Sequence, residues 1–183
     1  MIFDLLDYIL GEIKMLIYKL AYGAKLRYSV FSKYSNGIQI RLCQKGRLNI
    51  GQNVTLRDGV RIRVNFNGKV SLGSGVGLNN YSLINAMEEI TIGDNTIIGQ
   101  GVKIYDHDHD YKKKGKIRTT GFQVSPVQIG NNVWIGSNVT ILRGTQIGDN
   151  CVIGANTLVK GEIAANSLVF SKPNQEIRVI KKC

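Results

Sequence analysis

The 183 residues include Lys+Arg 24 against Asp+Glu 13, a formal net charge of +11, together with Gly 21 and Pro 2. Many glycines and few prolines favour one turn-rich β domain over a helical protein, and the positive charge favours an anionic partner such as a phosphorylated cofactor or lipid. The sequence has no arginine-rich tract or nucleic-acid motif, so nucleic-acid binding is not expected. The three scattered cysteines, Cys43, Cys151 and Cys183, indicate a reducing cytoplasm rather than a disulfide framework.

Residues 1–34 are predicted to form a helical segment. Its apolar residues recur at the spacing of one helix face: Leu5, Tyr8, Ile9, Ile13, Leu16, Ile17 and Leu20. Charged residues interrupt the segment, so we expect neither a membrane span nor a signal peptide. We expect the apolar face to pack on the rest of the chain or on another subunit. A membrane-surface role is the alternative, which five basic residues keep open: Lys14, Lys19, Lys25, Arg27 and Lys33.

Residues 35–170 carry a repeat with a period of six. In its clearest part the aliphatic positions are Ile129, Ile135, Ile141, Ile147, Ile153 and Val159. A helix would spread these residues around its surface, whereas short strands joined by tight corners place them all inside. Small or β-branched residues stand at the fourth position after each aliphatic residue. Asn or Asp lies between these two positions, where the backbone needs a left-handed conformation. The aliphatic positions fall in sets of three, which suggests three strands per coil.

Residues 106–126 break the repeat. A long ordered excursion from a compact solenoid is usually functional, and this one contains both histidines of the chain, His107 and His109. Imidazole can take a proton near neutral pH, so either histidine could act in acid–base chemistry. Residues 171–183 form a basic C-terminal tail after the repeat fades.

Three motifs together resemble the hexapeptide-repeat acyltransferases: Ile129–Ser137, Ile147–Ala155 and the Asp-His-Asp-His run that ends at His109. The sequence is most similar to the galactoside, maltose and xenobiotic acetyltransferases and the polysaccharide O-acetyltransferases. The resemblance implies an all-β, left-handed parallel β-helix that assembles as a homotrimer and binds acetyl-CoA between subunits. It implies acetyl transfer from acetyl-CoA to a hydroxyl of a sugar or polysaccharide precursor.

The resemblance also assigns roles to residues. His109 matches the catalytic histidine, the general base, and Asn79 matches an active-site asparagine that binds the acceptor or the oxyanion. Positions that approach the cofactor in the family match Ser137, Ala155, Lys160 and Arg178, and Trp134 is expected to line the same cleft. No metal site is expected. At Asn79 and Trp134 the alternative is a turn residue and ordinary packing, respectively.

The acceptor is not fixed by the sequence. Met87, with Glu88 beside it, stands where the resemblance implies an acid that contacts galactosides, which disfavours a simple galactoside. A lipid-linked sugar at the inner face of the membrane would explain both the apolar helix and the charge.

Three alternatives stay open. N-acetylation of an amino sugar would use the same base. A zinc hydratase resembling γ-carbonic anhydrases needs three imidazoles, whereas the chain has two histidines. A non-catalytic β-helix scaffold would have the same repeat, because one fold hosts many functions.

Overall fold

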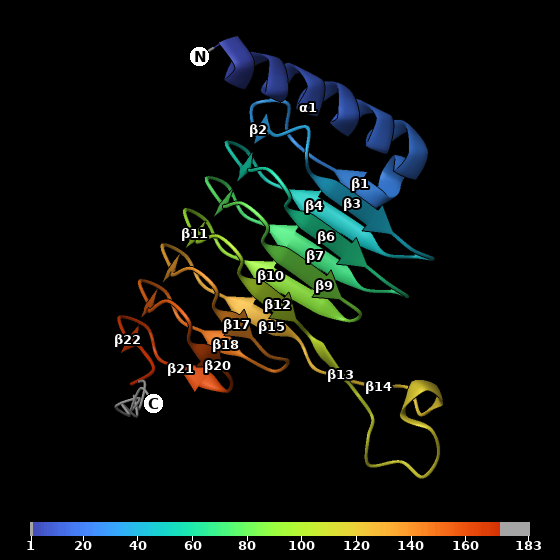
Figure 1. The fold of residues 1–183 in the computed structure, drawn as a ribbon, viewed down its shortest axis with the longest axis vertical. Helices are drawn as coiled ribbons and strands as arrows, with labels where there is room; N and C mark the ends of the chain where they lie inside the picture. The colour runs from blue at the N-terminus through green and yellow to red at the C-terminus, as the bar shows by residue number, and fades with distance from the viewer. Residues whose placement is uncertain (1, 173–183) are drawn as a thin grey trace, which may run out of the picture.

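The computed structural model describes residues 2–172, with side chains from residue 5 onward. One helix, α1 (Ile2–Tyr22), lies across the end of a solenoid of short parallel strands (Figure 1). A 3₁₀ turn, Gly23–Lys25, joins the two. The solenoid has three parallel sheets, here called A, B and C, and each full coil contributes one strand to each sheet.

Sheet A contains β1 (Leu26–Arg27), β4 (Arg47–Ile50), β7 (Lys69–Leu72), β10 (Glu89–Ile92), β15 (Val127–Ile129), β18 (Gln146–Ile147) and β21 (Glu162–Ile163). Sheet B contains β2 (Lys33–Tyr34), β5 (Thr55–Leu56), β8 (Gly77–Leu78), β11 (Ile97–Ile98), β16 (Trp134–Ile135), β19 (Val152–Ile153) and β22 (Leu168–Val169). Sheet C contains β3 (Gln39–Leu42), β6 (Arg61–Val64), β9 (Leu83–Ala86), β12 (Lys103–Tyr105), β17 (Thr140–Ile141) and β20 (Leu158–Val159).

The period of six has a direct structural meaning. Ile129, Ile135 and Ile141 end consecutive strands of sheets A, B and C, and all three are buried. Each stacks on its counterpart in the next coil, as Ile135 does on Ile98 and Ile153. The core is therefore a column of aliphatic side chains inside three sheets. The prediction of a parallel β-helix with an N-terminal helix is confirmed.

The corners explain the other repeat positions. Val133, Cys151 and Thr157 are buried in them, because a tight corner leaves room only for a small side chain. Asn132 and Asn150 have φ of 53° and 57°, a left-handed conformation that Asn tolerates better than most residues. The side chain of Asn132 also donates a hydrogen bond to Oδ1 of Asn150 at 2.8 Å. The predicted left-handed corners are confirmed.

The helix is oriented differently from the expectation. Gly11 and Met15 face the first coil, where Gly11 lies so close to the Tyr34 carbonyl that a Cβ would clash. The apolar face that contains Ile13 and Leu20 is exposed, so the expected packing on the rest of the chain is wrong, whereas the expected packing on another subunit stays a prediction. The first coil begins at Leu26, inside the 1–34 segment assigned to the helix. No helix within residues 2–172 is long and apolar enough to span a membrane.

Candidate active site

The excursion after β12 is a hairpin that projects from the solenoid (Figure 1). Its strands, β13 (His107–His109) and β14 (Phe122–Val124), pair antiparallel, and His109 lies opposite Phe122. At its base the amide of Ser125 donates to the carbonyl of Asp106 at 2.8 Å. The sequence predicted the excursion but gave no signal for the pairing. Both histidines are thus held on a strand rather than on a free loop.

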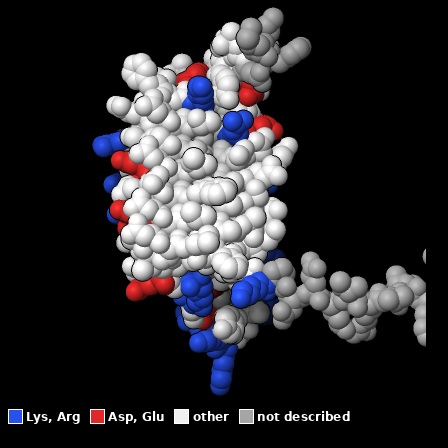
Figure 2. Space-filling view, turned by 90° about the vertical axis from the view of Figure 1, so that its left-hand side faces the viewer, with Lys and Arg blue, Asp and Glu red and all other residues white. Residues whose placement is uncertain are grey.

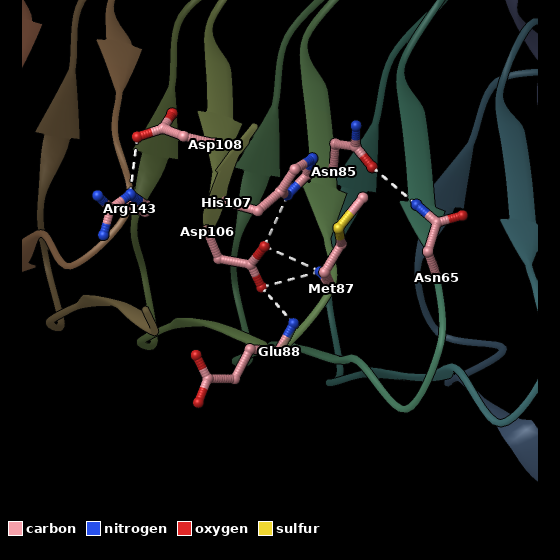
Figure 3. A network of polar contacts seen from close by, with 8 residues as sticks. All are labelled: Asn65, Asn85, Met87, Glu88, Asp106, His107, Asp108 and Arg143. Carbon is pink, nitrogen blue, oxygen red and sulfur yellow. Dashed lines mark hydrogen bonds and ion pairs between the residues drawn. The ribbon is translucent and has the colours of Figure 1, made fainter. Parts of the chain in front are cut away.

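Asp106 anchors the base of the hairpin to the preceding coil (Figure 3). Its carboxylate is fully buried and accepts hydrogen bonds from the amides of Met87 and Glu88, both at 2.8 Å. It also binds Nδ1 of His107 at 2.9 Å. A buried carboxylate with three donors is well compensated for the loss of water. Sequence reasoning did not single out Asp106.

His107 is held inside the base of the hairpin. Its side chain is 10% exposed, and its ring packs edge-on against Tyr105 and Phe122 at centroid distances of 6.1 and 5.7 Å. Because Asp106 Oδ1 accepts from Nδ1, the proton on that nitrogen is fixed and Nε2 is the remaining basic atom. The geometry gives His107 a clear role in positioning the hairpin.

His109 lies further out and is exposed. Its ring is 4.7 Å from that of Phe122, centroid to centroid. Within residues 2–172 its ring nitrogens make no hydrogen bond to protein, so either could meet a substrate. His109 is therefore the more accessible imidazole of the two.

Arg143, from the corner after β17, holds the hairpin from the solenoid side. Its Nε donates to Asp108 Oδ2 at 2.7 Å, and its Nη2 donates to Gln123 Oε1 at 2.9 Å. One guanidinium thus binds both strands of the hairpin at the Asp108–Gln123 pair, which is adjacent to the His109–Phe122 pair. Gln123 in turn donates to Asp110 at 3.0 Å. Arg143 was not predicted, because its partners are about 20 to 35 residues away in sequence.

A cleft of about 270 Å³ opens beside the hairpin. Its walls are Cys43, Gln44, Asn65, Phe66, Met87 and Phe122. The rings of Phe66 and Phe122 are 6.4 Å apart, and Asn65 Nδ2 donates to Asn85 Oδ1 at 3.1 Å on the adjoining strand. Since Phe122 also touches His109, the cleft and the exposed imidazole share one aromatic wall.

The other predicted site residues lie mainly along the corner between sheets B and C. Asn79 follows β8 there, and Ser137 and Ala155 follow β16 and β19 two and three coils further on. Asn79 Oδ1 accepts from the Asn80 amide at 3.1 Å, which occupies that oxygen locally. Trp134 lies on the outer surface of sheet B next to this corner and is 58% exposed.

One subunit does not bring His109 and Asn79 together. Asn79 precedes the strands of sheet C and His109 follows them, so a strand of four residues, roughly 13 Å, separates their positions. Lys160, directly after β20, lies at the same edge of sheet C as the hairpin. The predicted cofactor contact Arg178 falls outside the described residues.

Comparisons with known proteins agree with this architecture. Residues 126–161 match the model of the bacterial transferase hexapeptide family (six repeats). WbbJ of Escherichia coli (strain K12), named for O-acetyl transfer in lipopolysaccharide biosynthesis, is 35% identical over 145 residues, 75% of this chain and 72% of WbbJ. The galactoside O-acetyltransferase of the same organism is 37% identical over 113 residues, but that match covers only 53% of its length.

Solved structures share the fold. AntD, an N-acyltransferase from Bacillus cereus solved with an amino sugar nucleotide and coenzyme A, superposes with a TM-score of 0.70 at 20% identity, over 92% of this chain and 90% of AntD. The hexapeptide-repeat acetyltransferase VCA0836 from Vibrio cholerae, solved with acetyl coenzyme A, gives a TM-score of 0.56 at 24% identity, over 92% and 79%. At these identities the likeness establishes the fold alone.

Proposed function

Because the chain belongs to the hexapeptide-repeat acetyltransferase family and has its left-handed β-helix fold, we propose that it is a sugar O-acetyltransferase. It would transfer the acetyl group of acetyl-CoA to a hydroxyl group of a sugar or polysaccharide precursor. The observation that carries the proposal is the similarity to WbbJ and to galactoside O-acetyltransferase, joined to an exposed imidazole beside an aromatic cleft. Their names support the reaction class, and the cleft beside His109 supports an acceptor site there.

His109 is the proposed general base. An imidazole nitrogen takes the proton of the acceptor hydroxyl as its oxygen attacks the thioester carbonyl, and the C–S bond then breaks to release CoA, which recovers a proton. Such proton transfer contributes about 10²- to 10⁴-fold to rate. The exposure of His109 supports this choice, since Asp106 already occupies one nitrogen of His107. Direct transfer needs no acyl-enzyme.

The complete site is proposed to form between subunits of a homotrimer. The hairpin that carries His109 projects from one edge of sheet C, whereas Asn79, Ser137 and Ala155 lie at the other. In a trimer, Asn79, Ser137 and Ala155 of a neighbouring subunit could lie beside His109. The Asn79 amide or a backbone N–H would then stabilise the oxyanion.

Sheet B supports the assembly because the outer surface of its described strands is uncharged from β5 to β22, with Lys33 of β2 as the one charged residue at the end of the column. Figure 2 looks onto this face, where uncharged residues fill the centre and charged ones lie at the margins. Ile97, Trp134 and Leu168 stand in register along it and are 58%, 58% and 65% exposed. The equivalent columns of sheets A and C contain charges such as Arg47, Lys69 and Lys103. Depletion of charge is typical of an interface core.

The donor would lie along the B–C corner. The small side chains of Ser137 and Ala155 leave room for an extended pantetheine chain, and Trp134 adds an apolar wall. Lys160 and Arg178 are suited to the phosphates of CoA.

The test is acetyl-CoA consumption by the wild type, His109→Ala and His107→Asn over a panel of sugars, amino sugars and lipid-linked glycans. We expect acceptor-dependent turnover that falls about 100-fold or more in His109→Ala, with CoA binding retained. His107→Asn should lower the melting temperature more than His109→Ala does. Equal losses of turnover in both variants would refute the assignment of His109, and an amine-only acceptor would refute O-acetylation.

A further inference from the structure

The outer face of α1 is an unbroken apolar surface. Eight aliphatic side chains lie on it, each between 40% and 78% exposed: Leu5, Leu6, Ile9, Leu10, Ile13, Leu16, Ile17 and Leu20. At 100° per residue they cover the side of the helix opposite Gly11 and Met15, which face the first coil. A continuous apolar face on an outer helix is an interaction surface rather than scattered exposure.

The position of α1 makes this surface accessible. The helix lies across the end of the solenoid, so the face opposite the first coil points away from the body (Figure 1). It is fixed there by polar contacts with Asn36 along one flank: Lys14 donates to the Asn36 carbonyl at 2.6 Å, and Asp7 accepts from the Asn36 amide at 3.0 Å. The 21 residues of α1 span about 32 Å. A helix held flat in this way can lie on a surface but cannot insert across it.

The charge at this end of the molecule indicates what kind of partner binds the apolar face of α1. Residues 1–50 contain eight Lys or Arg against three Asp or Glu. Just past the helix, Lys25, Arg27 and Arg47 line one shallow hollow, and Lys33 is exposed on β2. A second copy of the chain docked face to face would bring two such positive ends together. An anionic surface would instead be attracted.

We propose that α1 docks the protein flat on an anionic membrane surface, with the aliphatic face in the interface and the basic residues against lipid headgroups. Binding of this kind grows with the apolar area buried and with attraction to anionic lipid. In a cyclic trimer the three helices would lie at the same end and face the same way, so their binding would add up. The docking itself depends neither on turnover nor on the trimer.

The test is sedimentation of the full chain with vesicles of phosphatidylcholine, alone or mixed with phosphatidylglycerol. The wild type should bind the mixed vesicles and lose affinity as salt is raised. The double variant Ile13→Glu/Ile17→Glu should bind them about tenfold more weakly or worse. The control is Ile117→Glu on the excursion, which makes one such change at a side chain 56% exposed and should bind within about twofold of the wild type; its direct match is the single variant Ile13→Glu, at a side chain 51% exposed, which should bind more weakly than the control.

Three results would overturn the proposal. One is no binding of the wild type to the mixed vesicles, and another is equal binding to neutral and anionic vesicles. The third is a larger assembly of the wild type that the double variant dissolves, which would make a second copy the occupant. Acetyl transfer to a soluble acceptor should be unchanged in the double variant, so the proposed enzyme activity and the docking can fail separately.

Discussion

Replacing Asp106 with Asn should destabilise the protein strongly, although the change is nearly isosteric. The carboxylate is fully buried and takes two backbone donors and one imidazole donor at 2.8 to 2.9 Å. An amide has one oxygen, so at least one donor would face an N–H group instead. Hydrogen bonds to a charged group contribute about 1.5–3 kcal/mol, so we expect a loss of about 2–3 kcal/mol. For a chain of this length that is a fall of about 5–10 °C in melting temperature.

Asp94→Asn is the matched control. Asp94 Oδ1 accepts from the Ser74 amide at 2.7 Å on an exposed corner, and in the next coil Asn131 Oδ1 makes the same bond to the Asp94 amide at 2.8 Å. Because Asn already performs this task one coil away, the control should stay within about 0.5 kcal/mol of the wild type. Thermal unfolding followed by circular dichroism at equal protein concentration compares the two. Equal melting temperatures would show that Asp106 does not anchor the hairpin.

Three further predictions follow from the site and the helix. Arg143→Met should lower the turnover number about tenfold or more while CoA affinity, measured by calorimetry, is retained, since Arg143 binds both strands of the hairpin; Arg143→Lys should recover part of the loss. Phe66→Asn should keep or raise the melting temperature, because Asn tolerates the φ of 52° at this position. The same change should raise KM for the acceptor, because Phe66 lines the cleft; a lower KM would contradict acceptor binding in the cleft. Burial raises the pKa of Glu12, whose Oε1 has no hydrogen-bond partner within the described residues. The contribution of Glu12 to stability is therefore complete below pH 4.5, its ordinary pKa, and is lost as the pH rises through the raised pKa. Glu12→Gln should therefore melt above the wild type at pH 7 and lose that advantage near pH 4.

The solenoid was predictable because each repeat position has its own physical requirement. Ile135 must fill the interior, Val139 must fit a corner, and Asn138 must adopt a left-handed φ, which is 59° in the structure. These requirements are local, so they leave a period in the sequence. The aliphatic spacing from Ile84 to Ile92 is eight residues instead of six, and the extra residues form the bulge at Met87 and Glu88, whose amides bind Asp106.

The orientation of α1 was not predictable from periodicity. A helical repeat of leucine and isoleucine reveals an apolar stripe but not which side of the helix the body contacts. Here the contact side is set by Gly11, whose missing side chain lets the helix approach Tyr34, and by Met15. Likewise, Arg143 reaches the hairpin through the fold rather than along the chain, and no local pattern marks such a pair.

Three corners of the described solenoid have a residue other than Asn or Gly at positive φ, and two of these residues line the cleft beside Phe122. Of the ten non-glycine residues at positive φ in the described chain, seven are Asn, and the exceptions are Gln44, Phe66 and Tyr81. A large side chain in this conformation costs of order 1–3 kcal/mol, which Asn would largely avoid. Gln44 and Phe66 occupy one corner in successive coils, and both line the cleft beside Phe122. Because a left-handed φ alone would favour Asn at both positions, we infer that these side chains serve the proposed acceptor cleft, which Tyr81 does not line.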